Sequence, residues 1–408
     1  MQVLFVHQNF PAQYQHVVPA LVARGHQVRA ITDAVNGKPE LIAVERYTHS
    51  AKPPAALTPL ASQFTEHVMR GQVVAQLAAK LRSEGYTPDL ICGHLGWGET
   101  LFLKDVWANT KVLVHAEFYY QARGADVGFD KEVYPSTLSA DIRVRARQAS
   151  LQLAMSTADR AQTATRFQAS VFPPELRQKI RVVHEGIKTE ICTPGPDTVI
   201  QLRNGSISLK PGDEVITFVN RNLEPYRGYH IFMRALPAIL KARPKARVII
   251  VGGDEASYGG TPDPALGPTW REIYFREVRD RLDLERVHFV GKIPYTVFLQ
   301  LMQVSAVHAY LTYPFVLSWS MLEAMSCGAL IVGSRTAPVE EVITDGENGR
   351  LVDFFDVAGW SEAVIDALAH PGKYKAMRAE ARRTVVERYD LAKIALPQQV
   401  ALVEEMGG

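Results

Sequence analysis

Cysteine is scarce in this chain, and dense clusters of one charge are missing. The 408 residues include three cysteines, an odd number at wide spacing: Cys92, Cys192 and Cys327. This usage predicts free thiols in a reducing cytosol rather than a disulfide framework. The formal net charge is +2, and no basic patch is interleaved with aromatic residues, so the composition does not support a nucleic-acid binder.

Export and membrane-spanning signals are missing too. The chain opens on a predicted strand, Gln2–Val6, without the basic region and cleavage site of a signal peptide, so we expect a protein that is not exported. Residues 299–333 carry almost no charge, but Pro314, Glu323 and Gly328 interrupt them. This segment is therefore predicted to form a strand, a loop, a buried helix and a strand rather than a membrane span.

Common phosphate-binding and metal-binding motifs are absent as well. The loop after the first strand, residues 7–14, contains no glycine, which argues against the dinucleotide turn of a nicotinamide or flavin dehydrogenase. No Walker A sequence is present, and no Asp-x-Asp pair offers metal ligands. The best basic run is Arg143, Arg145 and Arg147, which predicts either a solvated helix face or a phosphate or lipid contact.

The first half of the chain alternates short apolar runs with amphipathic helices. A helix over residues 15–24 lies between the first two strands and ends at Gly25. This alternation predicts a parallel sheet covered by helices. The predicted strands are residues 3–7, 27–32, 89–92, 111–115, a weaker one at 160–165, and 180–184.

A second alternation follows the sequence Pro194-Gly-Pro196, so we expect two doubly wound, Rossmann-like α/β domains with a cleft between them. The first domain is predicted over residues 1–195, the linker over 196–211 and the second domain over 212–387. In the second domain the predicted strands are residues 214–219, 247–251, 287–290, 307–311 and 330–333.

Two features of the second domain favour a nucleotide-sugar pocket. Glu323 lies near the start of an apolar helix that follows a loop, where helix N–H groups suit a phosphate and a carboxylate suits sugar hydroxyls. Alternatively, Glu323 caps the helix or pairs with an arginine. The loop after Val219 carries Arg221 and Arg227, which predict a diphosphate clamp unless either one pairs with Glu224.

Several short motifs, taken in order along nearly the whole chain, give it a family resemblance. They are Ala20–Val28, Val182–Ile187, the loop with Arg221 and Arg227, Arg286–Gly291, Leu322–Gly328 and Asp345–Gly349. With these motifs the chain resembles the GT-B glycosyltransferases of the large retaining group called family 4, or group 1.

The resemblance implies roles for particular residues. Arg221 and Arg227 would hold the donor diphosphate, and Glu323 would bind the nucleotide ribose. The backbone of Trp319 and Ser320 would meet the phosphate, and the backbone around Ile293 would meet the base. His115 matches the histidine that such enzymes place near the reacting sugar, although a lone histidine at a strand end is also often structural.

Two departures from the family pattern affect the expected sugar contacts. Phe315 occupies the position of a glutamate that contacts the donor sugar, so backbone groups would take over this contact, another carboxylate such as Glu117 would contribute, or the donor sugar is unusual. The first loop lacks the usual paired glycines, so acceptor contacts are expected instead from Gln8, Asn9, Gln13 or Tyr14.

The expected activity is therefore retaining sugar transfer from a UDP- or GDP-sugar to an acceptor hydroxyl, in polysaccharide, glycolipid or glycoconjugate synthesis. No metal and no cofactor are expected. A nucleotide-sugar epimerase or hydrolase and an inactive nucleotide-sugar-binding homologue are the alternatives. The resemblance also implies a cytoplasmic protein with a possible peripheral membrane contact, and a C-terminal helix, residues 388–408, that packs back on the first domain.

Overall fold

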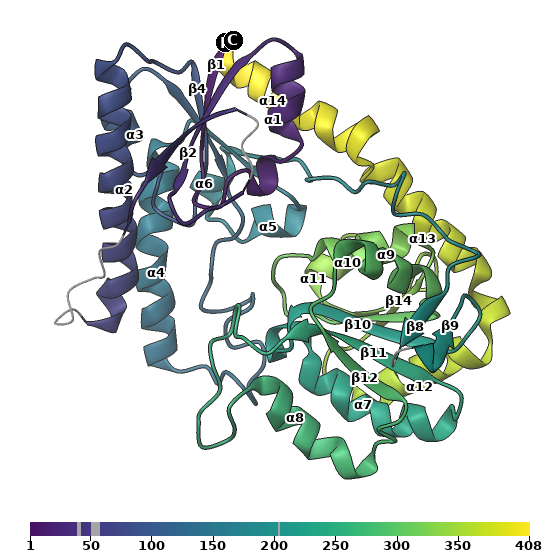
Figure 1. Ribbon diagram of the computed structural model, residues 1–408. Coiled ribbons are helices and arrows are strands. Elements are labelled where there is room, and N and C mark those ends of the chain that lie inside the picture. The colour runs from purple at the N-terminus through teal and green to yellow at the C-terminus, as the bar shows by residue number, and fades with distance from the viewer. Residues whose placement is uncertain (39–41, 50–57, 203–204) are drawn as a thin grey trace. The chain divides into compact units, whose positions relative to one another are not determined.

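The protein is described from a computed structural model that covers residues 1–38, 42–49, 58–202 and 205–408. The chain divides into two compact units, which are described separately below. The first consists of Met1–Gly186 together with Ala392–Gly408, and the second of Ile187–Leu391. Figure 1 shows both units, with most of their helices and many of their strands labelled.

The first unit is built on a seven-stranded sheet with the order β3-β2-β1-β4-β5-β6-β7. Every neighbouring pair in it is parallel. The strands are β1 (Gln2–Val6), β2 (Gln27–Asp33), β3 (Ala43–Tyr47), β4 (Leu90–His94), β5 (Lys111–His115), β6 (Arg160–Thr163) and β7 (Ile180–Val182). The central strands are apolar along their length because helices cover both faces of the sheet.

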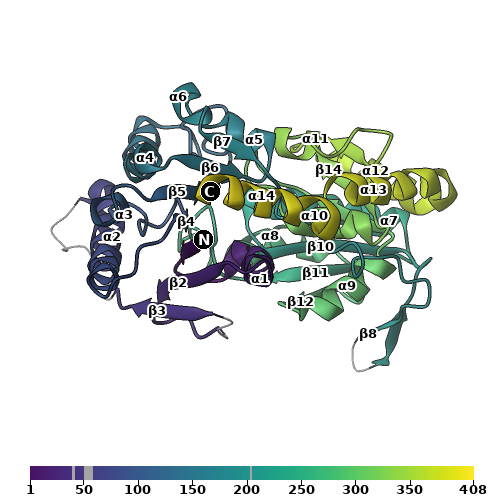
Figure 2. The same cartoon turned by 90° about the horizontal axis from the view of Figure 1, so that it is seen from above.

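Two sets of helices cover this sheet. Figure 2 shows α2, α3 and α4 on one side of it and α1 and α14 on the other. Val3 and Phe5 of β1 join the cluster that contains α1 and α14, as the alternation of side chains along a strand requires. The helices are α1 (Val17–Ala23), α2 (Pro59–Ser83), α3 (Leu103–Val106), α4 (Leu138–Thr157), α5 (Arg166–Ser170), α6 (Pro174–Arg177) and α14 (Leu396–Gly407).

The second unit contains a six-stranded parallel sheet with the order β12-β11-β10-β13-β14-β15. Its strands are β10 (Val215–Asn222), β11 (Arg247–Gly253), β12 (Val287–Gly291), β13 (Val307–Tyr310), β14 (Leu330–Ser334) and β15 (Arg350–Val352). An additional antiparallel pair is formed by β8 (Ile200–Leu202) and β9 (Ile207–Leu209).

Helices cover both faces of the second sheet as well. Figure 1 shows α9, α10 and α13 together in one layer, and α7, α8 and α12 in the other. These helices are α7 (Tyr229–Ala242), α8 (Trp270–Val278), α9 (Tyr295–Val304), α10 (Trp319–Ser326), α11 (Ala337–Glu340), α12 (Val357–Ala369) and α13 (Lys375–Arg388). Short 3-10 turns are η1 (Ala12–Tyr14), η3 (Pro225–Arg227), η4 (Arg279–Arg281) and η5 (Pro371–Tyr374), and a π-helical turn, η6 (Leu391–Ala395), precedes α14.

The prediction of two parallel α/β sheets is confirmed. Strands β3 and β15 were not predicted; they lie at sheet edges and are short or polar. The division between the units falls after Gly186 rather than after residue 195. The residues predicted as a linker, 196–211, contain the β8–β9 hairpin, whose Ile200 and Leu209 are buried in the core of the second unit.

Two further properties concern the cysteines and the helices. Cys92, Cys192 and Cys327 are buried, and none of them forms a disulfide. None of the helices in the described part of the chain has the length and the apolar character needed to cross a membrane.

Candidate functional site

Helix α10 of the second unit begins directly after a loop and has its own cap. The hydroxyl of Ser318 accepts a hydrogen bond from the backbone N–H of Ser320 at 3.3 Å. The backbone N–H of Ser318 in turn donates to the phenol oxygen of Tyr310 at 2.8 Å. Trp319, the first residue of the helix, is 39% exposed. The N-terminus of α10 is thus held in place by its loop and lies at the surface.

Glu323 lies one turn into this helix and is 9% exposed. Its Oε1 atom accepts a hydrogen bond from the Tyr295 hydroxyl at 2.7 Å, and the same hydroxyl lies 3.5 Å from the Cys192 Sγ. Burial raises the pKa of the Glu323 carboxyl, and the hydrogen bond from Tyr295 offsets part of this effect. The partner of Glu323 is therefore a tyrosine. Ser318, rather than Glu323, caps the helix.

The two arginines of the predicted clamp lie in different environments. Strand β10 continues to Asn222, so the prediction that Arg221 lies in a loop after Val219 is wrong; it lies in the strand and is exposed. Arg227 ends the turn η3 and is buried. Its Nη1 donates to the Thr312 hydroxyl at 2.7 Å and to the Val316 carbonyl at 2.9 Å.

Glu224, the alternative partner of these arginines, is used differently. Its Oε2 accepts hydrogen bonds from the backbone N–H groups of Ser257 and Tyr258, at 3.1 and 3.2 Å. Glu224 thus fixes the loop after β11. Across the described residues, it forms no ion pair with Arg221 or Arg227 within 4.0 Å.

Phe315 is buried in an aromatic cluster beside Arg227. Its ring centroid lies 4.9 Å from that of Tyr258 and 5.6 Å from that of Tyr226. The Arg227 guanidinium lies 5.7 Å from the Phe315 ring and 5.2 Å from the Tyr258 ring. An aromatic residue at position 315 therefore contributes to packing around the arginine, where it offers no hydrogen-bond acceptor. Ile293 packs its side chain against the core of this unit, and the role of its backbone stays a prediction.

In the first unit, three histidines lie in a row at the carboxyl ends of neighbouring strands. His7 follows β1, His94 ends β4 and His115 ends β5, and His94 pairs with His115 in the sheet register. The ring centroids of His7 and His94 lie 5.4 Å apart, as do those of His94 and His115. All three side chains are buried. Within the described residues, no group of three or more His, Cys, Asp or Glu is arranged to hold a metal ion.

The local backbone fixes the hydrogen-bonding role of two of these rings. The Nδ1 atom of His7 accepts a hydrogen bond from the N–H of Asn9 at 2.9 Å, and the Nδ1 atom of His94 accepts one from the N–H of Gly96 at 3.0 Å. Burial lowers the pKa of His7 to about 3, and burial together with the neighbouring His115 and His7 lowers the pKa of His94. Both rings are therefore neutral near pH 7 and carry their proton on Nε2.

His115 has a carboxylate neighbour. Its Nε2 atom lies 3.6 Å from the Oε1 of Glu185, a residue in the short segment that follows β7. The two side chains line a small cavity with Gln13 and Tyr14, and Gln399 is one of the α14 residues that close it. The structure thus brings His115 together with two of the predicted acceptor residues.

The other predicted acceptor residues are held more tightly. The backbone N–H of Gln8 donates to the Glu99 Oε1 at 2.8 Å, and the Gln8 side chain accepts from Arg70 at 2.8 Å. The Asn9 carbonyl accepts from Lys38 at 3.0 Å. These contacts fix the loop after β1, and the roles of Gln8 and Asn9 toward an acceptor stay predictions.

Four functional candidates of the first unit were missed in the sequence: His7, His94, Glu99 and Glu185. His7 and His94 end strands as His115 does, so a search for histidines at strand ends would have found them. Glu185 lies in the segment 182–187 that carries part of the family resemblance. Glu99 comes from a turn with no sequence signal, and its partner Tyr47 lies in the missed strand β3.

Comparisons with known proteins cover both units. A family model described as "Glycosyl transferase family 4 group" matches residues 24–192, and one described as "Glycosyl transferases group 1" matches residues 203–384. The chain belongs to the family 4 glycosyltransferases.

Curated relatives of this family 4 glycosyltransferase include D-inositol 3-phosphate glycosyltransferases. That of Mycobacterium sp. (strain JLS) is 27% identical over 210 residues, which are 51% of this chain and 42% of the relative. That of Corynebacterium glutamicum (strain R) is 24% identical over 47% of this chain and 43% of the relative. The match thus spans less than half of the length of these curated relatives.

Solved structures of the same fold match the whole chain. The Anabaena HepE protein in complex with UDP is 19% identical with a TM-score of 0.68, over 99% of this chain and 100% of that chain. Sucrose-phosphate synthase from Thermosynechococcus elongatus is 18% identical with a TM-score of 0.71, over 100% of this chain and 99% of that chain. The fold is therefore the GT-B α/β fold, with two Rossmann-like parallel-sheet domains.

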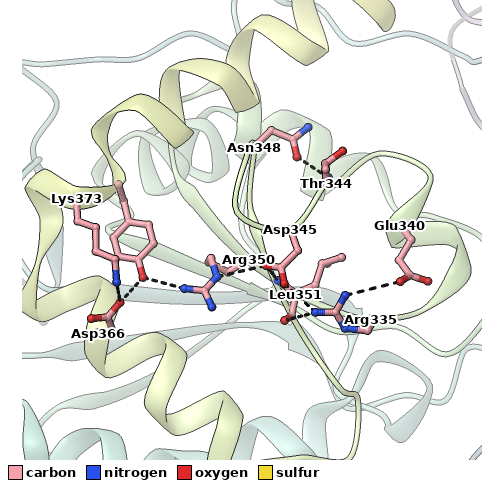
Figure 3. A network of polar contacts seen from close by, with 10 residues as sticks. Arg335, Glu340, Thr344, Asp345, Asn348, Arg350, Leu351, Asp366 and Lys373 are labelled. Carbon is pink, nitrogen blue, oxygen red and sulfur yellow. Dashed lines mark hydrogen bonds and ion pairs between the residues drawn. The ribbon is translucent and has the colours of Figure 1, made fainter.

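One motif behind the family resemblance, Asp345–Gly349, has a structural role. Figure 3 shows Asp345 between two arginines, Arg335 at 2.8 Å and Arg350 at 3.3 Å. Asp345 Oδ1 also accepts the backbone N–H of Leu351 at 3.0 Å, and the Asn348 side chain accepts the N–H of Thr344 at 2.8 Å. The motif therefore fixes the turn that leads into β15.

Proposed function

We propose that this protein is a retaining glycosyltransferase that moves a sugar from a nucleotide diphosphate-sugar to an acceptor hydroxyl. The observation that carries the proposal is the pair of family matches, which cover residues 24–192 and 203–384 and so include both units. Helix α10 supports it, because its N-terminus follows a loop and a carboxylate lies one turn further along.

The second unit would bind the donor. Glu323, held by Tyr295 at 2.7 Å, would accept hydrogen bonds from the two ribose hydroxyls. The N-terminus of α10 at Trp319 and Ser320 would face the diphosphate, although the N–H of Ser320 bonds to Ser318 in this conformation. The backbone around Ile293 would meet the base.

Arg227 would counter the charge that grows on the leaving diphosphate. Its guanidinium is buried and hydrogen-bonded through Nη1, so it is held in one orientation, and a donor fixed in advance stabilises developing charge without reorganisation. Arg221 would contribute from the exposed end of β10. Since arginines and a helix dipole balance the diphosphate charge, the proposal needs no metal and no cofactor.

The reaction would proceed without a protein nucleophile. The bond between the anomeric carbon and the diphosphate oxygen breaks, the acceptor oxygen forms the new bond on the same face of the sugar, and the leaving phosphate takes the acceptor proton. His115, with Glu185 3.6 Å away, would lie near the reacting sugar. Gln13 and Tyr14 share its cavity and would contact the acceptor.

The setting of the reaction is also a proposal. We place the protein in the reducing cytoplasm because its three cysteines are unpaired. The acceptor would be a carbohydrate, a lipid-linked molecule or a small molecule in polysaccharide, glycolipid or glycoconjugate synthesis. A lipid-linked acceptor would require a peripheral membrane contact.

A second candidate function, nucleotide-sugar binding without transfer, is favoured by Phe315 alone. Its ring lies beside Arg227 and offers no acceptor to a sugar hydroxyl. Under this reading the protein binds a donor and does not turn it over.

The test is donor binding and turnover with UDP-, GDP- and ADP-sugars. We expect one donor to bind to the wild type and to release its nucleoside diphosphate. Glu323→Gln and Arg227→Ala are expected to lose binding or turnover. Glu340→Gln, an exposed carboxylate change in the same unit, is the matched control. Binding without any release would favour the second candidate function, and wild-type behaviour of both variants would refute the site.

A further inference from the structure

Arg227 of the second unit is a buried cation without a carboxylate partner. It is 5% exposed, and its Nη1 donates to neutral groups, the Thr312 hydroxyl and the Val316 carbonyl. Among the described residues, no carboxylate forms an ion pair with it within 4.0 Å. Burying a charge is costly unless an opposite charge balances it. The guanidinium is therefore suited to an anionic ligand, although in this conformation a ligand has almost no access to it.

Aromatic rings cover this guanidinium. The ring centroids of Tyr258 and Phe315 lie 5.2 and 5.7 Å from its central carbon, and the Tyr258 hydroxyl accepts a hydrogen bond from it. Phe315 and Tyr226, the ring neighbours of Tyr258, are 3% and 7% exposed, whereas Tyr258 is 37% exposed. Tyr258 is thus the member of this aromatic group that lies at the surface.

The backbone of Tyr258 is fixed, while its ring is partly exposed. Tyr258 lies in the loop between β11 and α8. Its N–H and that of Ser257 both donate to the Glu224 Oε2, at 3.2 and 3.1 Å, and the Asn222 side chain donates to the Ser257 hydroxyl at 2.6 Å. A displacement of the ring therefore comes from rotation about its side-chain bonds, which exposed side chains undergo within picoseconds to nanoseconds.

We propose that Tyr258 is a side-chain gate over Arg227. In the free protein the phenol covers the guanidinium and accepts a hydrogen bond from it. When the donor binds, the ring rotates toward solvent, and an oxygen of the diphosphate replaces the phenol oxygen as the acceptor. The exchange is favourable because a hydrogen bond between two charged groups is stronger than one to a neutral hydroxyl. The inference rests on the proposed function in one respect: the anion that reaches Arg227 is the diphosphate of the nucleotide-sugar.

The gate has a measurable effect on affinity. Only the fraction of molecules in which the ring is turned away binds the diphosphate directly, so the apparent affinity is lower than the intrinsic affinity by that fraction. If the ring covers Arg227 in about 90% of the molecules, its removal should raise the affinity roughly tenfold. Ligands without a diphosphate do not reach Arg227, and their affinity should not change.

The cover can be tested without any nucleotide. Phenylglyoxal modifies accessible guanidinium groups, and mass spectrometry of the digested protein reports each arginine separately. Tyr258→Ala is expected to speed the labelling of Arg227 roughly tenfold and to leave that of the exposed Arg221 unchanged. Leu266→Ala shortens another side chain of the same loop, one that is 59% exposed, and should label as the wild type does. Equal labelling of Arg227 in Tyr258→Ala and Leu266→Ala would overturn the proposal.

Nucleotide binding tests what the gate admits. UDP, GDP and ADP are titrated by isothermal calorimetry, with the corresponding nucleosides as probes that lack the diphosphate. For the nucleoside diphosphate that binds, Tyr258→Ala should lower the Kd roughly tenfold and leave the Kd of its nucleoside unchanged. Tyr258→Phe keeps the ring, guards against misfolding and should bind more like the wild type than Tyr258→Ala does. Unchanged or weaker binding of the nucleoside diphosphate by Tyr258→Ala would overturn the proposal.

A double variant shows whether the effect acts through the cation. When Arg227→Ala is already present, the addition of Tyr258→Ala should give no gain in nucleoside diphosphate affinity, because the gate has nothing left to cover. The same gain with and without Arg227 would contradict the gate.

Failure of the proposed function gives a different pattern. If Tyr258→Ala exposes Arg227 to phenylglyoxal but neither this variant nor the wild type binds a nucleoside diphosphate, Tyr258 covers the cation and the assigned donor is wrong. If a nucleoside diphosphate binds and Arg227 reacts equally fast in the wild type and in Tyr258→Ala, the donor assignment stands and Tyr258 is not a gate.

Discussion

The hydroxyl of Tyr295, at the start of α9, donates a 2.7 Å hydrogen bond to the buried carboxylate of Glu323 in α10. The two side chains join consecutive helices on one face of the second sheet. A buried carboxylate needs such donors to stay ionised, and burial already raises the pKa of Glu323. Tyr295 therefore positions the group that we assign to the ribose.

Tyr295→Phe should destabilise the protein by about 1 to 3 kcal/mol at pH 7, because a buried carboxylate loses its donor. It should also weaken nucleotide binding. Urea unfolding and nucleotide titration measure the two effects. Tyr86→Phe is the control, since the Tyr86 hydroxyl is buried without a hydrogen-bond partner among the described residues, and its loss should cost nothing. Equal stability losses in the two variants would contradict this role of Tyr295.

Glu99 should make the stability of the protein fall as pH rises. Burial raises its pKa from the ordinary 4.5 to about 7, although its Oε1 accepts bonds from the Gln8 N–H and the Tyr47 hydroxyl. The folded state therefore holds a proton that the unfolded state releases above about pH 4.5. Its stabilising effect is complete below that pH and is lost as pH rises to about 7.

Glu99→Gln tests this sign, because the amide keeps the acceptor and cannot ionise. At about 1.4 kcal/mol per pKa unit, the free energy of unfolding of the variant should rise relative to that of the wild type by on the order of 3 kcal/mol between pH 4.5 and pH 8. Chemical unfolding across that range measures the gain. Glu84→Gln, an exposed change, should show no such trend. A constant difference between Glu99→Gln and the wild type would exclude a raised pKa.

The network in Figure 3 gives a prediction of the opposite sign. Burial raises the pKa of Asp345, but the Leu351 N–H and the guanidinium groups of Arg335 and Arg350 outweigh it and lower the pKa overall. Asp345→Asn should lower the free energy of unfolding by about 1 to 2 kcal/mol at pH 7. The loss is limited to this range because the carboxylate is partly exposed and solvent weakens its ion pairs.

The difference should vanish in acid. A lowered pKa gives stability that is present above the unfolded pKa near 3.8 and is lost as pH falls through the folded value. Thermal unfolding of Asp345→Asn and the wild type at pH 7 and pH 3 checks the trend. Glu340→Gln is the control, because Glu340 lies 4.0 Å from Arg335 and is half exposed, so it should change stability by less than about 1 kcal/mol. A loss at pH 3 as large as that at pH 7 would argue against this mechanism.

Sequence patterns predicted the sheets better than the contacts of the site. The buried strands of both sheets are apolar runs with helices between them, and this pattern depends only on burial. By contrast, the Tyr295–Glu323 bond joins two helices, and its partner could not be read from the segment around Glu323 alone. The separate environments of Arg221 and Arg227 arise because strand β10 extends to Asn222, beyond Val219, where the apolar run ends.

The histidine row shows the same limit. His115 was predicted from the family pattern, whereas His7 and His94 become neighbours only because β1, β4 and β5 lie side by side in the sheet. The spacing of the three histidines along the chain does not reveal the order of these strands in the sheet. Arg147 differs from Arg143 and Arg145 for a related reason: the three look alike on the helix until α2 and the strand-end loops form a pocket over one of them.

Helix α14 completes the core of the first unit, although it comes from the end of the chain. Leu402 and Val403 are buried with Val17, Val18 and Leu21 of α1 in one apolar cluster. Leu402→Ala should therefore destabilise the protein by about 2 to 5 kcal/mol through lost burial and the cavity left behind. Gln398→Ala, on the exposed side of the same helix, should leave stability within about 0.5 kcal/mol of the wild type. Urea unfolding measures both values, and similar small losses in the two variants would mean that α14 adds little to the stability of this unit.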